Sequence, residues 1–593
     1  MTGAGHERFP EAHPIEIVVA AGLGVAVLLA ASGWLIAETS AALAGHLAHL
    51  DFTGGLRGLI AWRHFTGDPR QGFPPTSQRL MPGPVGMYLA VAVDIPAVAL
   101  VGAAALRLAT RIRVSSRRGY ASSSEVRRAL SARAARARGR DNQRRATKGG
   151  ATVALGVDVR SRQHLFGATE DSYLYLGPPR SGKGVHLIIP QTIDAPGAAL
   201  VTATRPDTLR HTLPLRAQHG PVAVFDPQHL AGEQVPRLRW APHSGCANPL
   251  TAITRARALT AGAQLSPATV TDAAFWDGMT QAVLRCYLHA AALEHHTMRD
   301  VVGWTSRPSD PTPVRILRRH PDAAPGWADE LAAQAAADPR QRDSVWAGVR
   351  RAVDALADPR VLESCSPEEG EGFDPASFLA GRGTLYLLGT TGAQLTVAPL
   401  VTALVEALID AARTAGAGAV DGRLDPPLTV LLDEAANIAP IPSLPNLLAD
   451  GGGSGITTVC VLQSLAQARA RWGQAGADAM WDAATTKVIL GGLAHAEDLH
   501  RISQLVGEID EPVRTRTRGA GGASTSVGPR RLPVLPVDAL RTLRPGHAIV
   551  LARNARPVEA RLCPWWDGPH ASAIRMAIGP KSDRVPGGCG RPS

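Results

Sequence analysis

The stretch Leu174-Tyr-Leu-Gly-Pro-Pro-Arg-Ser-Gly-Lys-Gly184 decides the expected fold. An apolar run from Ser172 to Leu176 leads into this glycine-rich loop, and a run compatible with a helix follows from Val185 to Pro190. This strand–loop–helix order is the context that a phosphate-binding loop requires. Backbone N–H groups at the helix start cradle phosphate oxygens, and a lysine reaches the β- and γ-phosphates. The alternative is a strand, a turn and a helix with incidental glycines.

Lys183 is the predicted catalytic lysine of this loop. The chain has 62 basic residues, but only Lys148, Lys183, Lys487 and Lys581 are lysines. Arginine therefore serves where a generic charge suffices, and Lys183 is expected to act through its compact ammonium group. The Ser or Thr that usually follows this lysine and helps to hold Mg²⁺ is Gly184 here. The predicted contacts to the phosphates of ATP are Gly177, Pro178, Pro179, Arg180, Ser181, Gly182, Lys183, Gly184 and Val185.

The second element of such a site is an apolar strand that ends in an acid. The segment Leu428-Thr-Val-Leu-Leu-Asp-Glu434 fits this description. We predict that Asp433 holds Mg²⁺ through water and that Glu434 is the base that orients the attacking water. A buried strand with a solvated acidic end would show the same pattern.

A third strand is expected from Ile456 to Leu462, directly before Gln463. In a parallel sheet the carboxyl ends of the strands converge on one edge, where ligands bind. Gln463 is therefore predicted to lie near the γ-phosphate as a catalytic sensor. The alternative is that its amide caps the next helix.

These motifs resemble, in the same order, those of the type IV coupling proteins, the TraG/TraD-like motors of conjugative DNA transfer. A glycine after the lysine is common in that family, and the resemblance extends from Tyr120 to Trp566. The residues that carry it are Gly177 to Val185 with Ile188-Ile-Pro-Gln191, Asp433-Glu-Ala-Ala-Asn437 with Ile441-Pro-Ser-Leu-Pro445, and Leu462-Gln-Ser-Leu-Ala-Gln467.

The resemblance implies a RecA-like P-loop domain in a homohexameric ring ATPase at the membrane. Such a motor uses ATP and Mg²⁺ and feeds DNA with attached protein to a secretion channel. The implied partners are DNA bound without sequence preference, a relaxase or accessory transfer proteins, and the membrane proteins of the channel.

Two apolar stretches near the N-terminus, 17–37 and 85–106, are long enough to span a bilayer. A two-helix anchor fits them better than a signal peptide, because the region before the first stretch is not basic.

Residues 107–148 contain 14 basic residues and two acids, so this segment accounts for the net charge of +11. By the positive-inside rule we expect a cell-membrane protein with two spans, whose bulk and both termini are cytoplasmic. The basic segment could contact anionic lipid or DNA.

Beyond the basic segment, apolar β-type runs alternate with helical patterns, which predicts an α/β fold with a mainly parallel sheet. The expected strands are 172–177, 198–204, 221–227, 384–389, 428–433, 456–462 and 486–490. A long insertion without period-2 patterning is predicted to be all-helical. The expected domains are a membrane anchor (1–107), a basic juxtamembrane linker (108–150), the nucleotide-binding domain in two parts (151–250 and 376–566), the helical insertion (251–375) and a disordered tail (567–593).

Two features outside this pattern complete the organisation. Residues 512–533 are rich in Arg, Gly, Ser and Thr and are expected to form an exposed flexible loop, whereas 547–562 resembles a closing hairpin. Six cysteines are scattered without a C-x-x-C pair, which fits a reducing cytoplasm and argues against a disulfide framework or zinc knuckle.

Ring ATPases often complete each site with an arginine from a neighbouring subunit. Residues 435–462, between the acid strand and Gln463, contain no Arg or Lys. Arg469 and Arg471, on the next helical stretch, are the candidate arginine fingers, and Arg501 or Arg180 are alternatives. A solvated helix face would explain Arg469 and Arg471 equally well.

The leading hypothesis is a membrane-anchored ATPase that couples a relaxase–DNA substrate to a type IV secretion channel and drives its transfer. An FtsK-like chromosome translocase is a close alternative, against which the helical insertion and the 462–467 motif argue. A protein-cargo receptor that uses nucleotide only as a switch is a second alternative. Glu434 argues against it, because a pure switch needs no water-orienting base.

Overall fold

The computed structural model describes most of the chain from residue 119 onward. Residues 117–593 form one compact unit. The predicted spans 17–37 and 85–106 lie outside the described residues, apart from residues 85 and 86. No helix in the described part is both long enough and apolar enough to cross a bilayer. The described residues are 79, 83, 85–86, 119–141, 151–226, 229–232, 235–263, 273–368, 370–389, 394–519 and 522–579.

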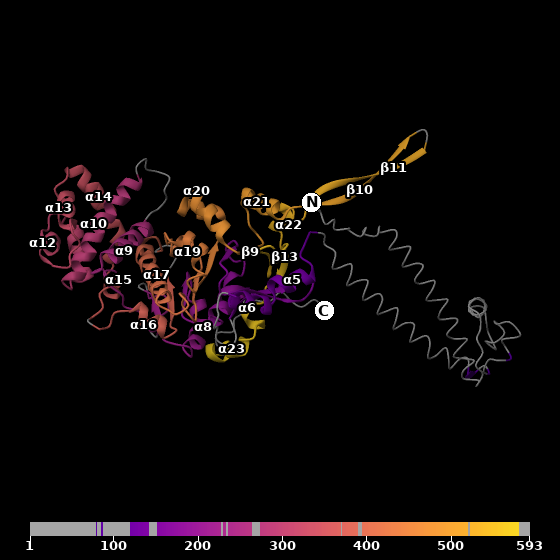
Figure 1. Ribbon diagram of the computed structural model, residues 1–593, viewed down its shortest axis with the longest axis horizontal. Coiled ribbons are helices and arrows are strands. Elements are labelled where there is room, and N and C mark those ends of the chain that lie inside the picture. Colours follow the sequence, from indigo (N-terminus) through magenta and orange to yellow (C-terminus); the bar gives the residue numbers. More distant parts are fainter. Residues whose placement is uncertain are drawn as a thin grey trace, which may run out of the picture. The chain divides into compact units, whose positions relative to one another are not determined.

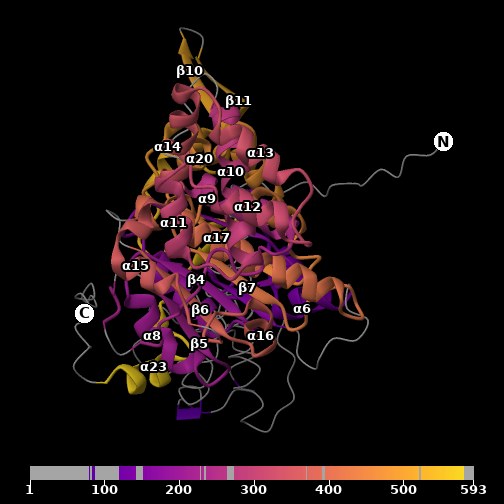
Figure 2. The same ribbon diagram turned by 90° about the vertical axis from the view of Figure 1, so that its left-hand side faces the viewer.

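An eleven-stranded sheet forms the centre of this unit (Figures 1 and 2). Its strand order is β2-β1-β13-β12-β9-β3-β8-β7-β4-β6-β5. The strands from β9 to β5 pair in parallel, and those from β12 to β2 extend the sheet in antiparallel fashion. The strands are β1 (Thr152–Asp158), β2 (His164–Ala168), β3 (Tyr173–Leu176), β4 (Ala199–Ala203), β5 (Val222–Phe225), β6 (Thr384–Leu388), β7 (Leu428–Leu432), β8 (Ile456–Leu462), β9 (Thr486–Leu490), β12 (His547–Ala552) and β13 (Val558–Arg561).

Continuous burial explains why the parallel strands could be recognised in the sequence. Every residue of β3, β4, β6, β7 and β8 is buried. Strands covered on both faces are expected to be apolar runs of this kind. All the strands predicted from such runs are present, and the predicted closing hairpin is β12–β13. Strands β1 and β2 were missed because only part of each is buried.

Between β5 and β6 the described residues form helices, and α10, α12, α13 and α14 gather to one side of the sheet in Figure 1. Helices α10 to α15 fall within the expected insertion 251–375, whereas α9 begins two residues before it and α16 extends beyond it. The standing of this insertion as a separate domain stays a prediction. The helices are α9 (Pro249–Ala263), α10 (Ala273–Leu293), α11 (Met298–Ser306), α12 (Thr312–Arg319), α13 (Trp327–Ala335), α14 (Pro339–Val353), α15 (Pro359–Ser364) and α16 (Pro375–Ala380).

Helices α9 and α17 (Gln394–Ala417) pack closely together, and residues of both belong to the hydrophobic core that also contains residues of β7 and β8. A Cβ atom on Gly262 of α9 would lie 2.5 Å from the Cα of Pro399 in α17. Only glycine permits this approach of the two backbones. The other helices are α7 (Ile189–Ile193), α8 (Asp207–Arg216), α18 (Ala435–Ile438), α19 (Leu444–Asp450), α20 (Leu465–Ala483), α21 (Ala496–Val506) and α22 (Val537–Arg541).

Two helices of the basic linker, α5 (Ser123–Leu130) and α6 (Ala132–Asp141), pack on the antiparallel side of the sheet. The buried carboxylate of Asp171 pairs with the guanidinium groups of Arg138, at 3.5 Å, and of Arg553. At least one arginine of the linker therefore serves to fasten α6 to the sheet.

Two expectations about the C-terminal part were wrong. Residues 512–533 are not a loop, because β10 (Glu508–Gly519) and β11 (Gly522–Pro533) form an antiparallel two-stranded ribbon. The tail expected to be disordered from residue 567 contains helix α23 (Ala571–Ile578). Its Ile574 is buried against α7 and α8 together with Trp565, which supplies the apolar contact that orders the segment. Residues 580–593 lie outside the described part.

Candidate nucleotide site

The phosphate-binding loop follows β3 at the carboxyl edge of the sheet. The ammonium group of Lys183 donates to the carbonyl oxygens of Gly177, at 2.7 Å, and Pro178, at 2.9 Å. Arg180 and Gly182 have positive φ angles of 63° and 86°. This left-handed backbone conformation favours glycine, which is the residue present at Gly182. At the exposed Arg180 the same conformation bends the chain. The loop is thus a compact turn with its lysine directed onto its own backbone.

A helix follows the loop, as the sequence predicts, but its first turn is wide. Residues Gly184–Ile188 form a π-helical turn that continues into α7. Gly184 and Val185 are the first residues of this turn, and the His186 ring contacts the carbonyl oxygen of Gly182 at 2.8 Å. Such π-turns are rare and occur mostly at functional sites.

The predicted acids lie at the end of β7. The Thr202 hydroxyl of the neighbouring strand β4 donates to the backbone oxygen of Asp433 at 2.8 Å, which fixes the strand end. Burial raises the pKa of the Asp433 carboxyl to about 6, although the charge of Lys183 acts in the opposite direction. Burial likewise lowers the pKa of Lys183, while Asp433 and Glu434 raise it. In both groups desolvation outweighs the attraction between the charges.

Two buried oxygens of the site test whether a magnesium nucleotide fits. Asp433 Oδ1 and Ser181 Oγ have no hydrogen-bond partner among the described residues. An unpaired buried polar atom costs about 1–3 kcal/mol. A carboxylate oxygen suits a hydrated Mg²⁺ ion, and a hydroxyl suits a phosphate oxygen. The residues present therefore fit the group that the sequence predicts.

Glu434 occupies a strained backbone position. Its φ and ψ angles of 52° and 46° are left-handed, and it is the residue before α18, a helix of four residues. A left-handed conformation at a residue other than glycine costs about 1–3 kcal/mol and often marks a functional site. The side-chain amide of Asn437 lies 3.5 Å from Glu434 Oε2.

The sheet order brings Gln463 between the loop and the acids. Strand β8, which ends just before Gln463, pairs in parallel with β3 on one side and with β7 on the other. The backbone N–H of Gly177 donates to the carbonyl of Leu462 at 3.1 Å. Gln463 is not the helix cap, because Ser464 caps α20. The juxtaposition is as predicted, and the role as a sensor stays a prediction.

The candidate arginine fingers are both engaged within the chain. Arg469 forms an ion pair of 3.0 Å with the buried Asp498 of α21. Arg471 Nε donates to the carbonyl oxygen of Ala436 at 2.8 Å. The alternative Arg501 pairs with Asp478 at 2.5 Å. None of these contacts was predicted, because their acceptors are remote in sequence or belong to the backbone.

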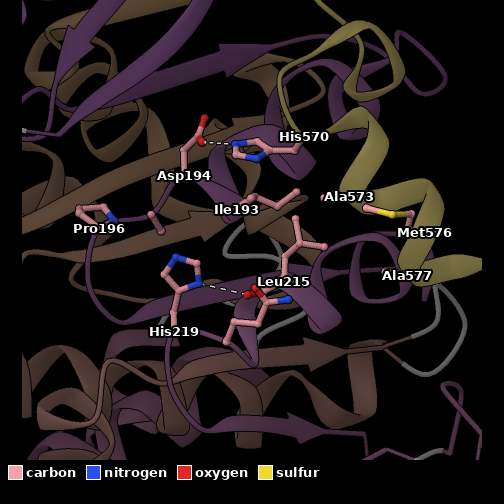
Figure 3. Close-up of a pocket in the computed structure, with 11 residues that line it drawn as sticks. Ile193, Asp194, Pro196, Leu215, His219, His570, Ala573, Met576 and Ala577 are labelled. Carbon is pink, nitrogen blue, oxygen red and sulfur yellow. Dashed lines mark hydrogen bonds and ion pairs between the residues drawn. The ribbon is translucent and has the colours of Figure 1, made fainter.

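A separate pocket of about 740 Å³ lies at the end of α7 remote from the loop (Figure 3). Asp194, which follows α7, pairs with His570 before α23 at 2.7 Å. Leu215 of α8 and His219, three residues beyond the end of α8, contribute to the wall. No predicted nucleotide contact lines this pocket, so it is distinct from the nucleotide site.

Comparison with known proteins finds one sequence family and several structures that resemble this chain. Residues 427–545, which include β7, the acids and Gln463, match the sequence family described as the TraM recognition site of TraD and TraG. The unbound form of the bacterial conjugative coupling protein TrwB aligns with a TM-score of 0.51 and 17% identity, over 72% of this chain and 91% of that chain. Residues 427–545 therefore match a family of TraD and TraG proteins, and the fold of the chain is that of the coupling protein TrwB.

Further structures of coupling proteins show the same fold. TrwB in complex with the non-hydrolysable GTP analogue GDPNP aligns with a TM-score of 0.50 and 17% identity, over 72% of this chain and 92% of that chain. The resemblance that the motifs indicated is confirmed, as is an α/β fold with a large, mostly parallel sheet. No curated protein sequence matches this chain.

Proposed function

We propose that this protein is an ATPase that couples a relaxase–DNA substrate to a type IV secretion channel and drives its transfer. One observation carries the enzymatic part of the proposal. The P-loop lysine, the Asp433–Glu434 pair and Gln463 lie at the carboxyl ends of the adjacent strands β3, β7 and β8. This is the arrangement in which a triphosphate can be held and attacked by water.

Each residue of the site has a distinct role in this proposal. The backbone N–H groups of the loop and Lys183 bind the phosphates. Asp433 holds Mg²⁺ through water, and the ion when bound neutralises developing phosphate charge. Glu434 orients the attacking water and accepts its proton, while Gln463 senses the γ-phosphate. Arg469 and Arg471 are the candidates that the sequence offers for an arginine finger acting between subunits, and each would have to leave its bond within the chain to do so.

The transfer function is supported by the family. The matched family is described as a TraM recognition site, which supports an interaction with accessory transfer proteins. The structural relative TrwB is described as a conjugative coupling protein. We therefore propose sequence-independent DNA binding, contacts to relaxase and channel proteins, and assembly as a homohexamer.

A membrane location is proposed on the sequence alone. The apolar stretches 17–37 and 85–106 supply two spans, and the basic residues of 107–148 favour a cytoplasmic bulk. The arginine of the linker that pairs with Asp171 is not free for lipid or DNA, which leaves the other basic residues of the segment for such contacts.

The decisive experiment measures ATP turnover by the purified full-length protein, without DNA and with single- or double-stranded DNA. We expect turnover that DNA stimulates and that Lys183→Arg abolishes, because the arginine fork cannot replace the compact ammonium in the loop. Lys487→Arg is the matched control: this lysine lies on β9, and its ammonium donates to the Ala484 carbonyl.

Three outcomes would contradict the proposal. Normal ATP turnover in Lys183→Arg would show that the loop around Lys183 is not the site of ATP hydrolysis. Binding of ATP without any turnover would favour the nucleotide-switched cargo receptor. Translocation along duplex DNA that requires no relaxase or channel protein would favour the FtsK-like alternative.

A further inference from the structure

The first part of helix α20 connects the two sides of the nucleotide site. It begins directly after Gln463, where Ser464 Oγ accepts from the backbone N–H of Gln467 at 3.3 Å. The side-chain oxygen of Gln467 in turn accepts from the backbone N–H of Gln463 at 3.1 Å. The start of the helix is therefore bonded to the backbone of the predicted sensor.

The other end of this helical part contacts the segment that follows the acids. Arg471 Nε donates to the carbonyl oxygen of Ala436 at 2.8 Å, and Trp472 Nε1 donates to that of Ile441 at 2.9 Å. Two neighbouring side chains thus hold both ends of the stretch 436–441. Burial lowers the pKa of the Arg471 guanidinium. A partly buried arginine whose donor meets a backbone carbonyl is a structural element rather than a solvated surface charge.

The segment held by these bonds cannot orient Glu434 by itself. Helix α18 has four residues, and its preceding residue, Glu434, is in the strained left-handed conformation. A single helical turn is not stable alone. Within this described segment, only the Asn437 amide contacts the Glu434 carboxylate, at 3.5 Å, so the direction of the Glu434 side chain depends on how α18 is held. The Arg471–Ala436 bond holds α18 two residues from Glu434.

A break in α20 separates this connecting part from the remainder of the helix. Gly473, directly after Trp472, has φ and ψ angles of 72° and 174°, which are not helical. The connecting part is thus the short helical piece from Leu465 to Trp472. Arg469 anchors it through the Asp498 ion pair, and Asp498 also accepts from the N–H of Leu465 at 3.1 Å.

We propose that Arg471 is a positioning residue that acts within its own subunit by holding α18, and with it the Glu434 carboxylate, in place for water activation. Through the same helical piece, a movement of the backbone at Gln463 changes the position of Glu434. This inference rests on the proposed ATP hydrolysis. It differs from the arginine-finger assignment, in which Arg471 would act on the nucleotide of a neighbouring subunit.

A double-mutant cycle on the full-length protein tests the proposal. We expect Arg471→Ala to lower kcat about 10–100-fold, since misplacing a catalytic group by about 1 Å has an effect of this order. The affinity for a fluorescent ATP analogue should stay within about twofold of wild type, and Arg471→Lys should recover part of kcat. On a Glu434→Gln background, Arg471→Ala should cause no further loss in single-turnover hydrolysis, because residues that act as a unit are not additive.

Control variants separate positioning from a general loss of structure. Gln474→Ala changes an exposed residue of the same helix, beyond the Gly473 break, and should leave kcat unchanged. Trp472→Phe removes only the donor to Ile441 and should reduce kcat less than Arg471→Ala. Thermal melts of each variant identify any that fail to fold. If Arg471→Ala does not fold, Arg471→Lys takes its place in the double-mutant cycle.

The outcomes distinguish this inference from the proposed function. If wild type hydrolyses no ATP, the proposed function fails, and this inference fails with it. If wild type is active but Arg471→Ala and Glu434→Gln are additive, only the positioning role is overturned. Recovery of activity when Arg471→Ala subunits are mixed with Lys183→Ala subunits would also overturn it, because that result requires Arg471 to act between subunits.

Discussion

Replacing Asp433 by asparagine should stabilise the nucleotide-free protein at neutral pH. Burial raises the pKa of this carboxyl from 3.8 to about 6, and the nearby charge of Lys183 does not offset the burial. A difference of about two units corresponds to about 3 kcal/mol between the folded and unfolded states. The wild-type protein pays this amount to keep the carboxylate charged, and the amide of the variant does not.

The sign of the pH dependence follows from the raised pKa. Because the folded-state pKa lies above the unfolded-state value, the folded protein binds a proton more readily between about pH 4 and pH 6. Wild type therefore loses stability as the pH rises through this window. The difference between Asp433→Asn and wild type should be close to zero at about pH 4 and should reach about 3 kcal/mol above about pH 7.

Thermal unfolding followed by tryptophan fluorescence measures this difference. An unfolding entropy of about 2 cal/mol/K per residue, applied to residues 117–593, is about 1 kcal/mol/K, so a Tm rise of about 3 °C is expected at pH 7.5. Asp538→Asn, at an exposed position, controls for the loss of one surface charge. An equal Tm gain at pH 4 and pH 7.5, or no gain at pH 7.5, would refute the reasoning.

Three further variants test other parts of the structure. Glu434→Gln should bind ATP but hydrolyse it about 10²–10⁴-fold more slowly; an unchanged single-turnover rate would exclude Glu434 as the base. Asp171→Ala should lower stability by about 3 kcal/mol and expose α6 to protease, because Arg138 and Arg553 lose their buried partner. An unchanged Tm would contradict that role. Ser181→Ala removes a buried hydroxyl that has no partner among the described residues, so it should raise the Tm of the nucleotide-free protein slightly. It should also weaken ATP binding roughly tenfold. Unaltered affinity in a binding titration would argue against a contact between the Ser181 hydroxyl and a phosphate.

The parts predicted correctly from the sequence share one physical cause. Strands buried on both faces must be apolar throughout, so β7 and β8 were recognisable, and the residues that follow them had to lie at the same edge. These two facts predict that Gln463, the loop and the acids lie at one edge of the sheet, whereas the position of β8 between β3 and β7 is seen only in the structure. No side-chain geometry was needed for that prediction.

The parts that were missed depend on long-range or polar interactions. The ribbon β10–β11 has no apolar alternation, and its strands pair with each other rather than with the main sheet. The contact of Arg471 with Ala436 joins residues 35 positions apart, and that of Thr202 with Asp433 joins residues 231 apart. Such bonds leave no periodic pattern, because a hydroxyl or guanidinium can reach any nearby carbonyl.

The ribbon also offers a practical entry point into the molecule. Its first and last residues, Glu508 and Pro533, are paired in the ladder, so the chain leaves and returns at one place. An epitope or a fluorophore-labelled peptide inserted between Gly519 and Gly522 would therefore lengthen the far end of the ribbon and leave the strand order of the main sheet intact. A label at that point would report on the surroundings of the ribbon without altering the candidate nucleotide site.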